Sequence, residues 1–243
     1  MPLSRSWSTI EVHVDGDVAY VRFNRPEHKN AVTTAMVIEM DQALTELATD
    51  DSLSVVVLTG NGTTFCPGAD LSARAKPRSG DAPRGLPDLS AYNSALLLRE
   101  MPQVTVAVVN GGCAGPGMAW ASACDLRIAT SRARFSTAFL EVGLAGELGL
   151  SWTLEQLLGA AIARDLCFLP RKMAADELQR LGFLSQVFPD ETFQADADAF
   201  VAALAARGRS ALRALKANFV DAGRMPLREY LAVESARHQS FFQ

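Results

Sequence analysis

Two turns rich in glycine and other small residues could hold a reacting oxygen in this 243-residue chain. The first covers residues 65–71 (FCPGADL) and the second residues 111–117 (GGCAGPG). Each follows a short apolar run typical of a buried strand, and each precedes a segment with helical character. Glycine lets a ligand approach the backbone closely, and the start of a helix leaves N–H groups unpaired. If the two strands are neighbours, two N–H groups can converge on one oxygen as an oxyanion hole, where each donor is worth about 2.7–4 kcal/mol in a transition state.

Two other interpretations of these turns remain open. They can be ordinary glycine turns of a close-packed sheet, without any ligand. A dinucleotide-binding turn also follows a strand, but its G-x-G-x-x-G fingerprint is not met, because Trp120 stands where the third glycine is needed after Gly115 and Gly117.

The elements that must position the turns follow from the apolar pattern. Runs at 9–14 and 18–24 flank Asp15-Gly16-Asp17 and predict a β-hairpin. Asn30 is predicted to cap a helix from Ala31 to Ala48, and the run at 54–59 predicts a strand buried on both faces. Further strands are predicted at 104–110 and 125–129, and further helices ending near residue 100 and at 118–124, 154–158, 174–181, 192–206, 210–220 and 227–239. Alternating strands and helices predict parallel pairing with right-handed crossovers.

Composition argues against several classes of protein. With 49% hydrophobic and 21% charged residues the chain is typical of a globular domain, and its net charge of −4 gives no basic footprint for nucleic acid. The four cysteines and three histidines lack zinc-ligand spacing, so we expect no metal. No apolar run approaches the length of about 18 residues that a membrane span needs, and residues 1–7 lack the apolar core of a signal peptide. We therefore expect a cytoplasmic protein that does not enter a membrane.

Several motifs in order resemble the enoyl-CoA hydratase/isomerase (crotonase) superfamily. Asn24-Arg25-Pro26 with Asn30-Ala31 resembles its first signature, and residues 65–71 resemble its F-x-x-G-A-D-L turn. Residues 110–125 resemble its N-G-x-x-x-G-x-G…C-D segment, and residues 133–135, 143–144 and 157–159 continue the order. The resemblance covers residues 9 to about 240.

The resemblance implies an α/β fold with a crotonase-like ββα spiral core over residues 1–190 and a helical C-terminal trimerisation region over residues 191–243. It also implies an acyl-CoA thioester as substrate, with coenzyme A as part of that substrate and no separate cofactor. The expected assembly is a homotrimer or a dimer of trimers.

The family pattern assigns binding roles to residues around the two turns. The Ala69 N–H is implied as one oxyanion donor, and the other donor belongs at Pro116, which has no N–H. Either the second donor is missing, or the turn is shifted so that the Gly117 N–H serves. The complete set of implied substrate-binding residues is Arg25, Lys29, Ala31, Gly68, Ala69, Asp70, Leu71, Pro116, Met118 and Phe139.

One glutamate remains as the implied acid/base. The two glutamates of the family's hydratases are replaced by Ala119 and Phe139, so their two-carboxylate mechanism does not transfer. A third family position, which carries a catalytic carboxylate in some isomerases and in a dehalogenase, holds Glu147 among small and apolar neighbours that raise a carboxyl pKa. A single carboxyl suits a 1,3-proton shift, so we favour isomerase over hydratase. A helix-start role for Glu147, and a non-catalytic acyl-CoA binder, remain the alternatives.

Other conspicuous residues have structural explanations. Asp70 and Asp125 are expected to hold a turn and a strand start, and the competitor Glu141 is expected to face solvent or form a salt bridge. Trp120 and Trp152 are predicted to be core residues. Cys66 and Cys113 are expected to be buried and inert, and residues 72–90 to form a surface loop, while Arg25 and Lys29 can equally be solvated.

Overall fold

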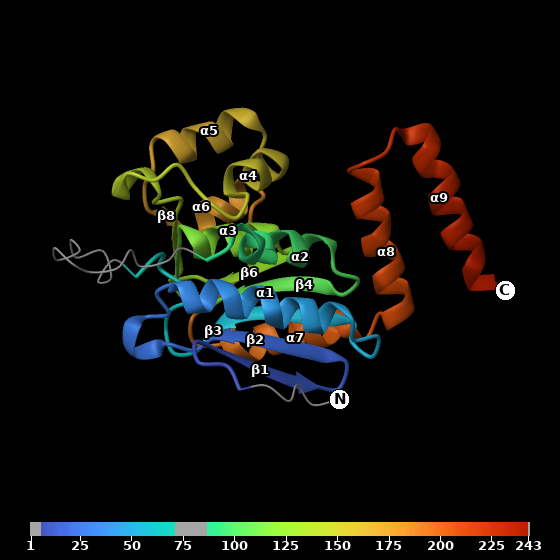
Figure 1. Ribbon diagram of the computed structural model, residues 1–243, viewed down its shortest axis with the longest axis horizontal. Coiled ribbons are helices and arrows are strands. Elements are labelled where there is room, and N and C mark those ends of the chain that lie inside the picture. The colour runs from blue at the N-terminus through green and yellow to red at the C-terminus, as the bar shows by residue number, and fades with distance from the viewer. Residues whose placement is uncertain (1–5, 71–86, 243) are drawn as a thin grey trace.

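A six-stranded sheet forms the centre of the computed structural model, which describes residues 6–70 and 87–242 (Figure 1). Its strands are β1 (Ile10–Asp15), β2 (Val18–Phe23), β3 (Val55–Gly60), β4 (Val104–Val109), β6 (Leu126–Thr130) and β9 (Gln186–Phe188). Their order across the sheet is β1-β2-β3-β4-β6-β9; β1 and β2 are antiparallel and every other neighbouring pair is parallel. Because β3 and β4 are parallel neighbours, the two glycine turns leave the same edge of the sheet.

A smaller sheet continues from that edge and forms a second layer. It contains β5 (Gly112–Ala114), β7 (Arg134–Ser136) and β8 (Met173–Ala174) in that order. Isolated bridges from Val32 to Ala69 and from Cys66 to Cys113 extend the same ladder to earlier parts of the chain. Each passage of the chain therefore runs through a strand of the large sheet, a short segment of this ladder and then a helix.

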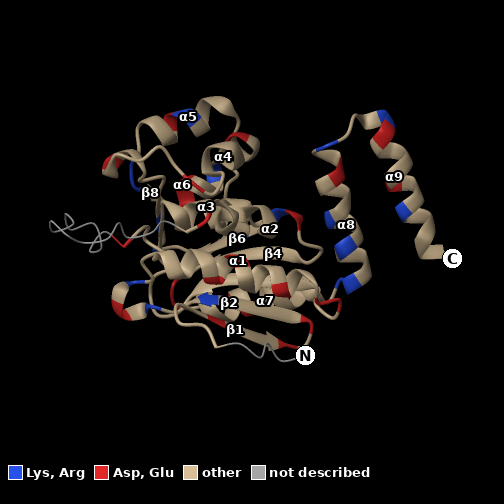
Figure 2. Cartoon of the chain, in the orientation of Figure 1, with Lys and Arg blue, Asp and Glu red and all other residues tan. Residues whose placement is uncertain are grey.

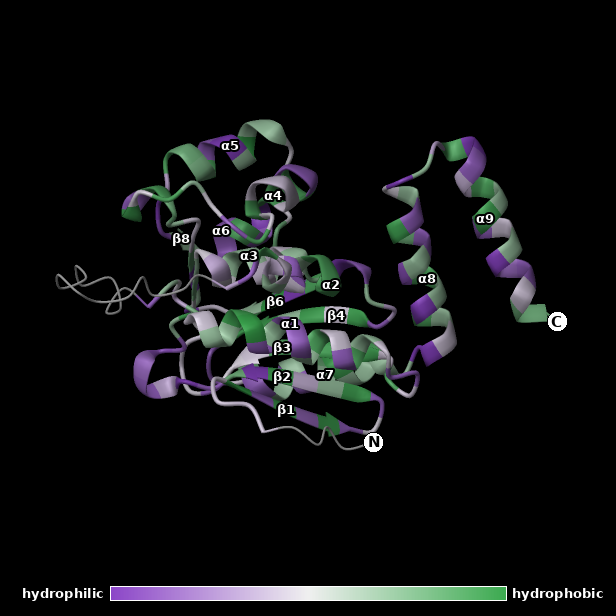
Figure 3. Ribbon diagram, viewed as in Figure 1, coloured by the Kyte–Doolittle hydropathy of each residue, from purple (hydrophilic) through white to green (hydrophobic). Residues whose placement is uncertain are grey.

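Helices bury both faces of the large sheet, because successive strand residues point to opposite sides. Val56 and Leu58 of β3 join the core that lies beneath α1 (Thr34–Ala48), α2 (Ser94–Glu100) and α3 (Pro116–Ala123). Val55 and Val57 face α7 (Phe193–Ala205) on the other side. The central strands are correspondingly apolar along their length (Figure 3), and the predicted burial of β3 on both faces is confirmed.

The second half of the chain is mainly helical. The remaining helices are α4 (Leu150–Leu158), α5 (Ala160–Phe168), α6 (Ala175–Arg180), α8 (Arg209–Ala222) and α9 (Leu227–Gln239). The α8–α9 pair projects from the body of the molecule and carries charges of both signs (Figures 1 and 2). Among the described helices, none is both long and apolar enough to cross a membrane.

The anchor of α8 is a buried lysine. The Lys216 Nζ donates to Leu98 O at 2.9 Å and to Gln103 O at 2.8 Å, and it pairs with Asp125 Oδ2 at 2.8 Å. Asp125 also accepts from the Thr105 N–H at 2.7 Å, which confirms that it holds the start of a strand. Because burying an unpaired ammonium is costly, these contacts fix α8 beside α2 and β4.

The hairpin and strands β3, β4 and β6 lie where the sequence predicts them, whereas β5, β7, β8 and β9 were not predicted. The start of α1 also differs from the prediction. The helix begins at Thr34, and Thr33 is its cap, accepting from the Met36 N–H at 3.2 Å. The prediction that Asn30 is the cap was therefore wrong. Asn30 is fully buried in the left-handed region (φ 61°), and its side-chain amide donates to Asn61 O and Thr64 O. It fixes the loop that follows β3.

Candidate active site

A single cavity of about 200 Å³ joins the two glycine turns to the segment that carries Glu147. The cavity is lined by Pro67, Gly68, Ala69, Gly115, Pro116, Ala138, Phe139, Glu141, Val142, Leu144 and Glu147. It is small because the two turns are in direct contact: a Cβ added to Gly115 would lie 3.6 Å from the Gly68 Cα. The sequence prediction that two chain reversals meet at one place is confirmed for the backbone.

Main-chain hydrogen bonds hold the two turns in register. The Cys66 N–H donates to Gly112 O and the Ala114 N–H donates to Cys66 O, each at 2.9 Å. Gly68 (φ 116°) and Gly115 (φ 53°) adopt backbone angles that residues with a Cβ rarely take. The glycines are needed both for these angles and for the close approach of the two segments.

The Ala69 amide points into the open side of the first turn. The Val32 N–H donates to Gly68 O and the Asp70 N–H donates to Val32 O, both at 2.9 Å. In a parallel bridge of this kind the intervening N–H faces away from the partner strand. The Ala69 N–H consequently makes no hydrogen bond to another described residue, and Ala69 is exposed in the cavity wall. It is available to a ligand oxygen.

The second turn presents no equivalent donor at its first helical residue. Pro116 lines the cavity at the first position of α3, where a proline is well tolerated but offers no N–H. The Gly117 and Gly68 N–H groups lie near the buried Cys66 thiol and act to lower its pKa, against the larger effect of burial. Gly117 itself is not among the cavity-lining residues, and a Cβ there would meet Cys66 O at 2.4 Å. Among the described residues that line the cavity, Ala69 of the first turn offers an unoccupied amide, whereas Pro116 of the second turn offers none.

Glu147 faces the turns from the segment between the short helix η4 (Leu140–Val142) and α4. Its side chain is partly buried, and desolvation raises the pKa of the carboxyl. Among the described residues it makes no ion pair or side-chain hydrogen bond, so no cation counteracts this shift. Its charge raises the pKa of Tyr92 and of the Cys66 thiol, which places the carboxyl near both groups. A partly buried carboxyl whose pKa is raised in this way is suited to take up and return a proton.

Glu141 also lines the cavity, although sequence reasoning assigned it only to solvent. Its side chain is exposed, as expected, but η4 places it at the cavity mouth across from the turns. The signal that could have found it is the turn at Gly143 (φ 72°), which folds residues 139–147 back on themselves. Two carboxyls of different burial therefore face one small space.

The other predicted binding residues lie around the cavity but not on its wall. Arg25 forms an ion pair with Asp70 at 3.1 Å and donates to Ala31 O, so Asp70 does hold its turn as expected. Lys29 is exposed, and Met118 is fully buried in the core. Leu71 and most of the predicted loop at residues 72–90 lie outside the described residues.

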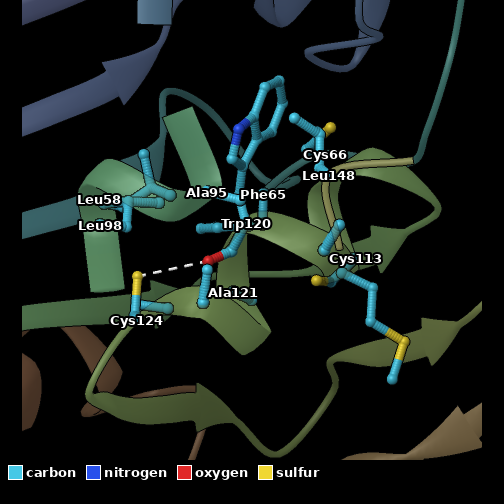
Figure 4. Close-up of a cluster of buried hydrophobic side chains, with 14 of the residues drawn as sticks. Leu58, Phe65, Cys66, Ala95, Leu98, Cys113, Trp120, Ala121, Cys124 and Leu148 are labelled. Atoms are coloured by element: carbon cyan, nitrogen blue, oxygen red, sulfur yellow. Dashed lines mark hydrogen bonds between the residues drawn. The ribbon is translucent and has the colours of Figure 1, made fainter. Parts of the chain in front are cut away.

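The conspicuous cysteines and tryptophans divide between core and surface. Burial raises the pKa of the Cys66 thiol to about 12 and that of the Cys113 thiol well above its ordinary value, in agreement with inert thiols. Trp120 is fully buried among apolar side chains (Figure 4). Its indole N–H donates to Ser94 Oγ at 2.8 Å. The prediction that Trp152 is a core residue was wrong, because its side chain is 52% exposed. In residues 6–70 and 87–242 no group of three or more His, Cys, Asp or Glu side chains could hold a metal ion.

Comparison with known proteins identifies the family. The enoyl-CoA hydratase/isomerase family model matches residues 13–243. EchA12 of Mycobacterium tuberculosis, named as an enoyl-CoA hydratase, is 36% identical over 185 residues, which cover 74% of this chain and 65% of that protein. Human enoyl-CoA delta isomerase 2 is 34% identical over 220 residues, 88% of this chain and 54% of the human protein. The chain thus spans less than two thirds of the length of these relatives.

The fold comparison agrees with the sequence comparison. A crystal structure from Thermobifida fusca, described as that of an enoyl-CoA hydratase in complex with acetoacetyl-CoA, superposes with a TM-score of 0.86 at 29% identity, covering 96% of this chain and 94% of that one. The chain belongs to the enoyl-CoA hydratase/isomerase (crotonase) family. The predicted crotonase-type α/β fold is confirmed.

Proposed function

We propose that the protein binds an acyl-CoA thioester and moves a proton beside its carbonyl group, most simply by shifting a double bond in an enoyl-CoA. The observation that supports this best is the shared cavity, in which an unoccupied Ala69 N–H and the partly buried Glu147 carboxyl face the same space. Relatives named as isomerases and as hydratases both fall in the family, so the reaction must be argued from the site.

In the proposed mechanism the thioester oxygen accepts a hydrogen bond from the Ala69 N–H. This contact stabilises the negative charge that develops on the oxygen when a proton leaves the adjacent carbon. Glu147 in its ionised form takes that proton, and the electron pair moves into the enolate. The same carboxyl, now neutral, returns the proton to the carbon two positions further along, which shifts the double bond and regenerates the carboxylate. One carboxyl therefore suffices for the whole cycle.

A complete oxyanion hole has two N–H donors, and in this site the second donor is the one in question. We propose Gly117 as that donor only when its N–H, which lies beside the Cys66 thiol and outside the cavity wall, turns toward the cavity, since Pro116 has no hydrogen to offer. Otherwise the site works with one donor, at an expected loss of about 10²–10³ in rate.

The coenzyme A portion is proposed to lie along the rim of the first turn. Arg25, Lys29 and Ala31 stand beside Asp70 there, and Lys29 is the exposed cation among them. Met118 lies beneath the second turn and shapes the floor from within the core.

A homotrimer, or a dimer of trimers, is proposed as the assembly. The α8–α9 pair supports it, because its exposed side chains include large apolar residues that a monomer gains nothing by exposing. These residues are Leu215, Phe219, Leu227, Leu231, Phe241 and Phe242.

Hydration is the second candidate reaction, and a specific observation favours it. Glu141 lines the same cavity as Glu147, so a second carboxyl is available to orient a water molecule. Against hydration, the two positions that carry the family's hydratase glutamates hold Ala119, which is fully buried, and Phe139, which closes the cavity wall.

The test is to incubate the protein with a 3-enoyl-CoA in deuterated water and to follow the products by NMR. Isomerisation predicts a 2-enoyl-CoA, with deuterium appearing where the carboxyl exchanges its proton with solvent. A 3-hydroxyacyl-CoA formed from a 2-enoyl-CoA would indicate hydration instead. Tight binding of the thioester without any product would point to a non-catalytic acyl-CoA binder.

A further inference from the structure

A second and larger cavity begins one residue beyond Glu147. Its volume is about 460 Å³, and Leu148 and Gly149 form the end of its wall that adjoins the proposed active site. The remaining wall comes from the segment before α2, from α2 itself, from α4 and from α8, and it is mostly apolar. A space of this size and position suits the acyl tail of a thioester whose carbonyl is held at Ala69.

One cation in this wall has no carboxylate partner among the described residues. The Arg99 guanidinium lies 4.6 Å from the centre of the Trp152 ring, and no acidic side chain among the described residues pairs with it. Arg224 lines the same cavity but forms an ion pair with Glu100, so its charge is already neutralised. Stacking on Trp152 holds the guanidinium flat and leaves its N–H donors free for a planar anion.

The arginine stands at the far end of the cavity from the reacting groups. Tyr92, Leu96 and Arg99 are spaced four and three residues apart and lie on one side of a continuous helical segment. Tyr92 is close enough to Glu147 for the carboxylate to raise its pKa. Seven residues of helix separate Tyr92 from Arg99, which corresponds to about 10 Å at 1.5 Å per residue.

We propose that the acyl group of the substrate ends in a carboxylate, and that Arg99, stacked on Trp152, binds this carboxylate while the apolar wall surrounds the chain between. The proposal rests on the proposed function, because it assumes that the thioester carbonyl is held at the glycine turns. A purely hydrocarbon tail would cover the guanidinium without supplying an acceptor, and desolvating a charge in that way is unfavourable. A terminal carboxylate accepts hydrogen bonds from the guanidinium N–H groups and so orients the tail.

The same guanidinium could instead meet an anion from coenzyme A itself, whose phosphates share this chemistry. The experiment therefore compares three ligands by calorimetry: octanoyl-CoA, the mono-CoA thioester of octanedioic acid, and free coenzyme A. None of the three carries a double bond to move, so the measurement is independent of turnover.

For the wild type we expect the octanedioyl thioester to bind about tenfold or more tightly than octanoyl-CoA, as one charge-assisted contact allows. Arg99→Gln should abolish this preference without weakening octanoyl-CoA, whose tail no longer covers a charge, and should leave the affinity for free coenzyme A unchanged. Arg99→Lys keeps the charge but loses the planar fork, so it should retain only part of the preference. Arg164→Gln, at an exposed arginine on α5, is the matched control and should behave as the wild type.

Equal affinity of the wild type for the two thioesters would overturn the proposal. So would an Arg99→Gln variant that weakens all three ligands alike, because the arginine would then serve the coenzyme A phosphates. Thermal melting of each variant shows that it remains folded. If the preference is present but no enoyl-CoA is converted, the proposed reaction fails while the tail-binding proposal stands.

Discussion

The two glycine turns of the cavity each follow a strand of the large sheet and use a glycine with positive φ, but they differ in what their amides face. In the first turn the Val32 bridge occupies the neighbouring groups and leaves the Ala69 N–H unpaired. In the second, Pro116 removes one N–H, and the next residue, Gly117, lies beside the Cys66 thiol and outside the cavity wall. An oxyanion site therefore depends on which individual N–H groups are available as well as on the fold, because a pair of glycine turns can supply one donor or two.

The largest effect is expected from removing the donor of the first turn. Ala69→Pro deletes an N–H that bonds to no described residue, so it removes the ligand contact without breaking a bond of the ladder. Turnover should fall by about 10²–10³. The measurement is kcat/KM for isomerisation, with thermal melting as a control for folding. Activity close to that of the wild type would mean that the thioester oxygen is held elsewhere.

Restoring a donor to the second turn tests the other half of the comparison. Pro116→Ala returns an N–H at the first position of α3, at the cavity wall. If this hydrogen reaches the thioester oxygen, kcat/KM should rise by up to about 10²-fold, whereas a structural loss alone would lower it. Steady-state kinetics beside a melting curve separates the two results. A melting temperature that falls while the rate stays unchanged would show that the proline serves the helix alone.

The dependence of the rate on pH provides a prediction of intermediate size. Burial raises the pKa of Glu147, and the proposed base is its ionised form. As pH falls through this raised pKa, kcat/KM should decline, with a midpoint above that of an ordinary glutamate.

A folded-state pKa above the unfolded value also means that the carboxyl contributes most to stability below its unfolded pKa, and that this contribution is lost as pH rises through the folded pKa. Glu147→Gln should therefore gain stability over the wild type at neutral pH and none in acid, which denaturant titrations at both pH values measure.

The smallest effect on chemistry, and a clear effect on stability, is expected at Gly117. A methyl group there would meet Cys66 O at 2.4 Å, so Gly117→Ala should destabilise the protein by about 1–3 kcal/mol through overpacking. Gly112→Ala is the matched control, because its Cβ would find only an ordinary contact with the Thr64 Cγ2 at 3.6 Å. Urea titration of both variants checks the difference. Equal stabilities would show that the turns are less tightly packed than described.

Sequence alone predicted the parts of the molecule that depend on local pattern. The continuous apolar run of β3 and the glycine-rich turns around residues 68 and 115 predicted the buried strands and the meeting of the turns. Asn30 looked like a helix cap because its residue type favours caps, but its amide is used 31 and 34 residues away, which no local pattern reveals. Trp152 was predicted to be a core residue from its residue type. Its ring instead stacks with Arg99, which lies on another helix, so the contact could not be predicted from the local sequence.

Of the two carboxyls in the cavity, sequence reasoning predicted the environment of one and missed the position of the other. The small and apolar neighbours of Glu147 indicated a raised pKa, and burial does raise it. The approach of Glu141 to the same cavity depends on the reversal at Gly143, so it could not be predicted from its own surroundings. Contacts made across the fold were the ones that sequence reasoning missed.

The most direct test of the central claim compares Glu147→Gln with Glu141→Gln. Each change removes one ionisable oxygen from the same cavity while keeping its size, so the pair separates proton transfer from shape. We predict that Glu147→Gln abolishes isomerisation of a 3-enoyl-CoA, with an unchanged dissociation constant for a saturated acyl-CoA, and that Glu141→Gln keeps most of the wild-type rate. Wild-type turnover in Glu147→Gln, or loss of turnover in Glu141→Gln alone, would contradict the account.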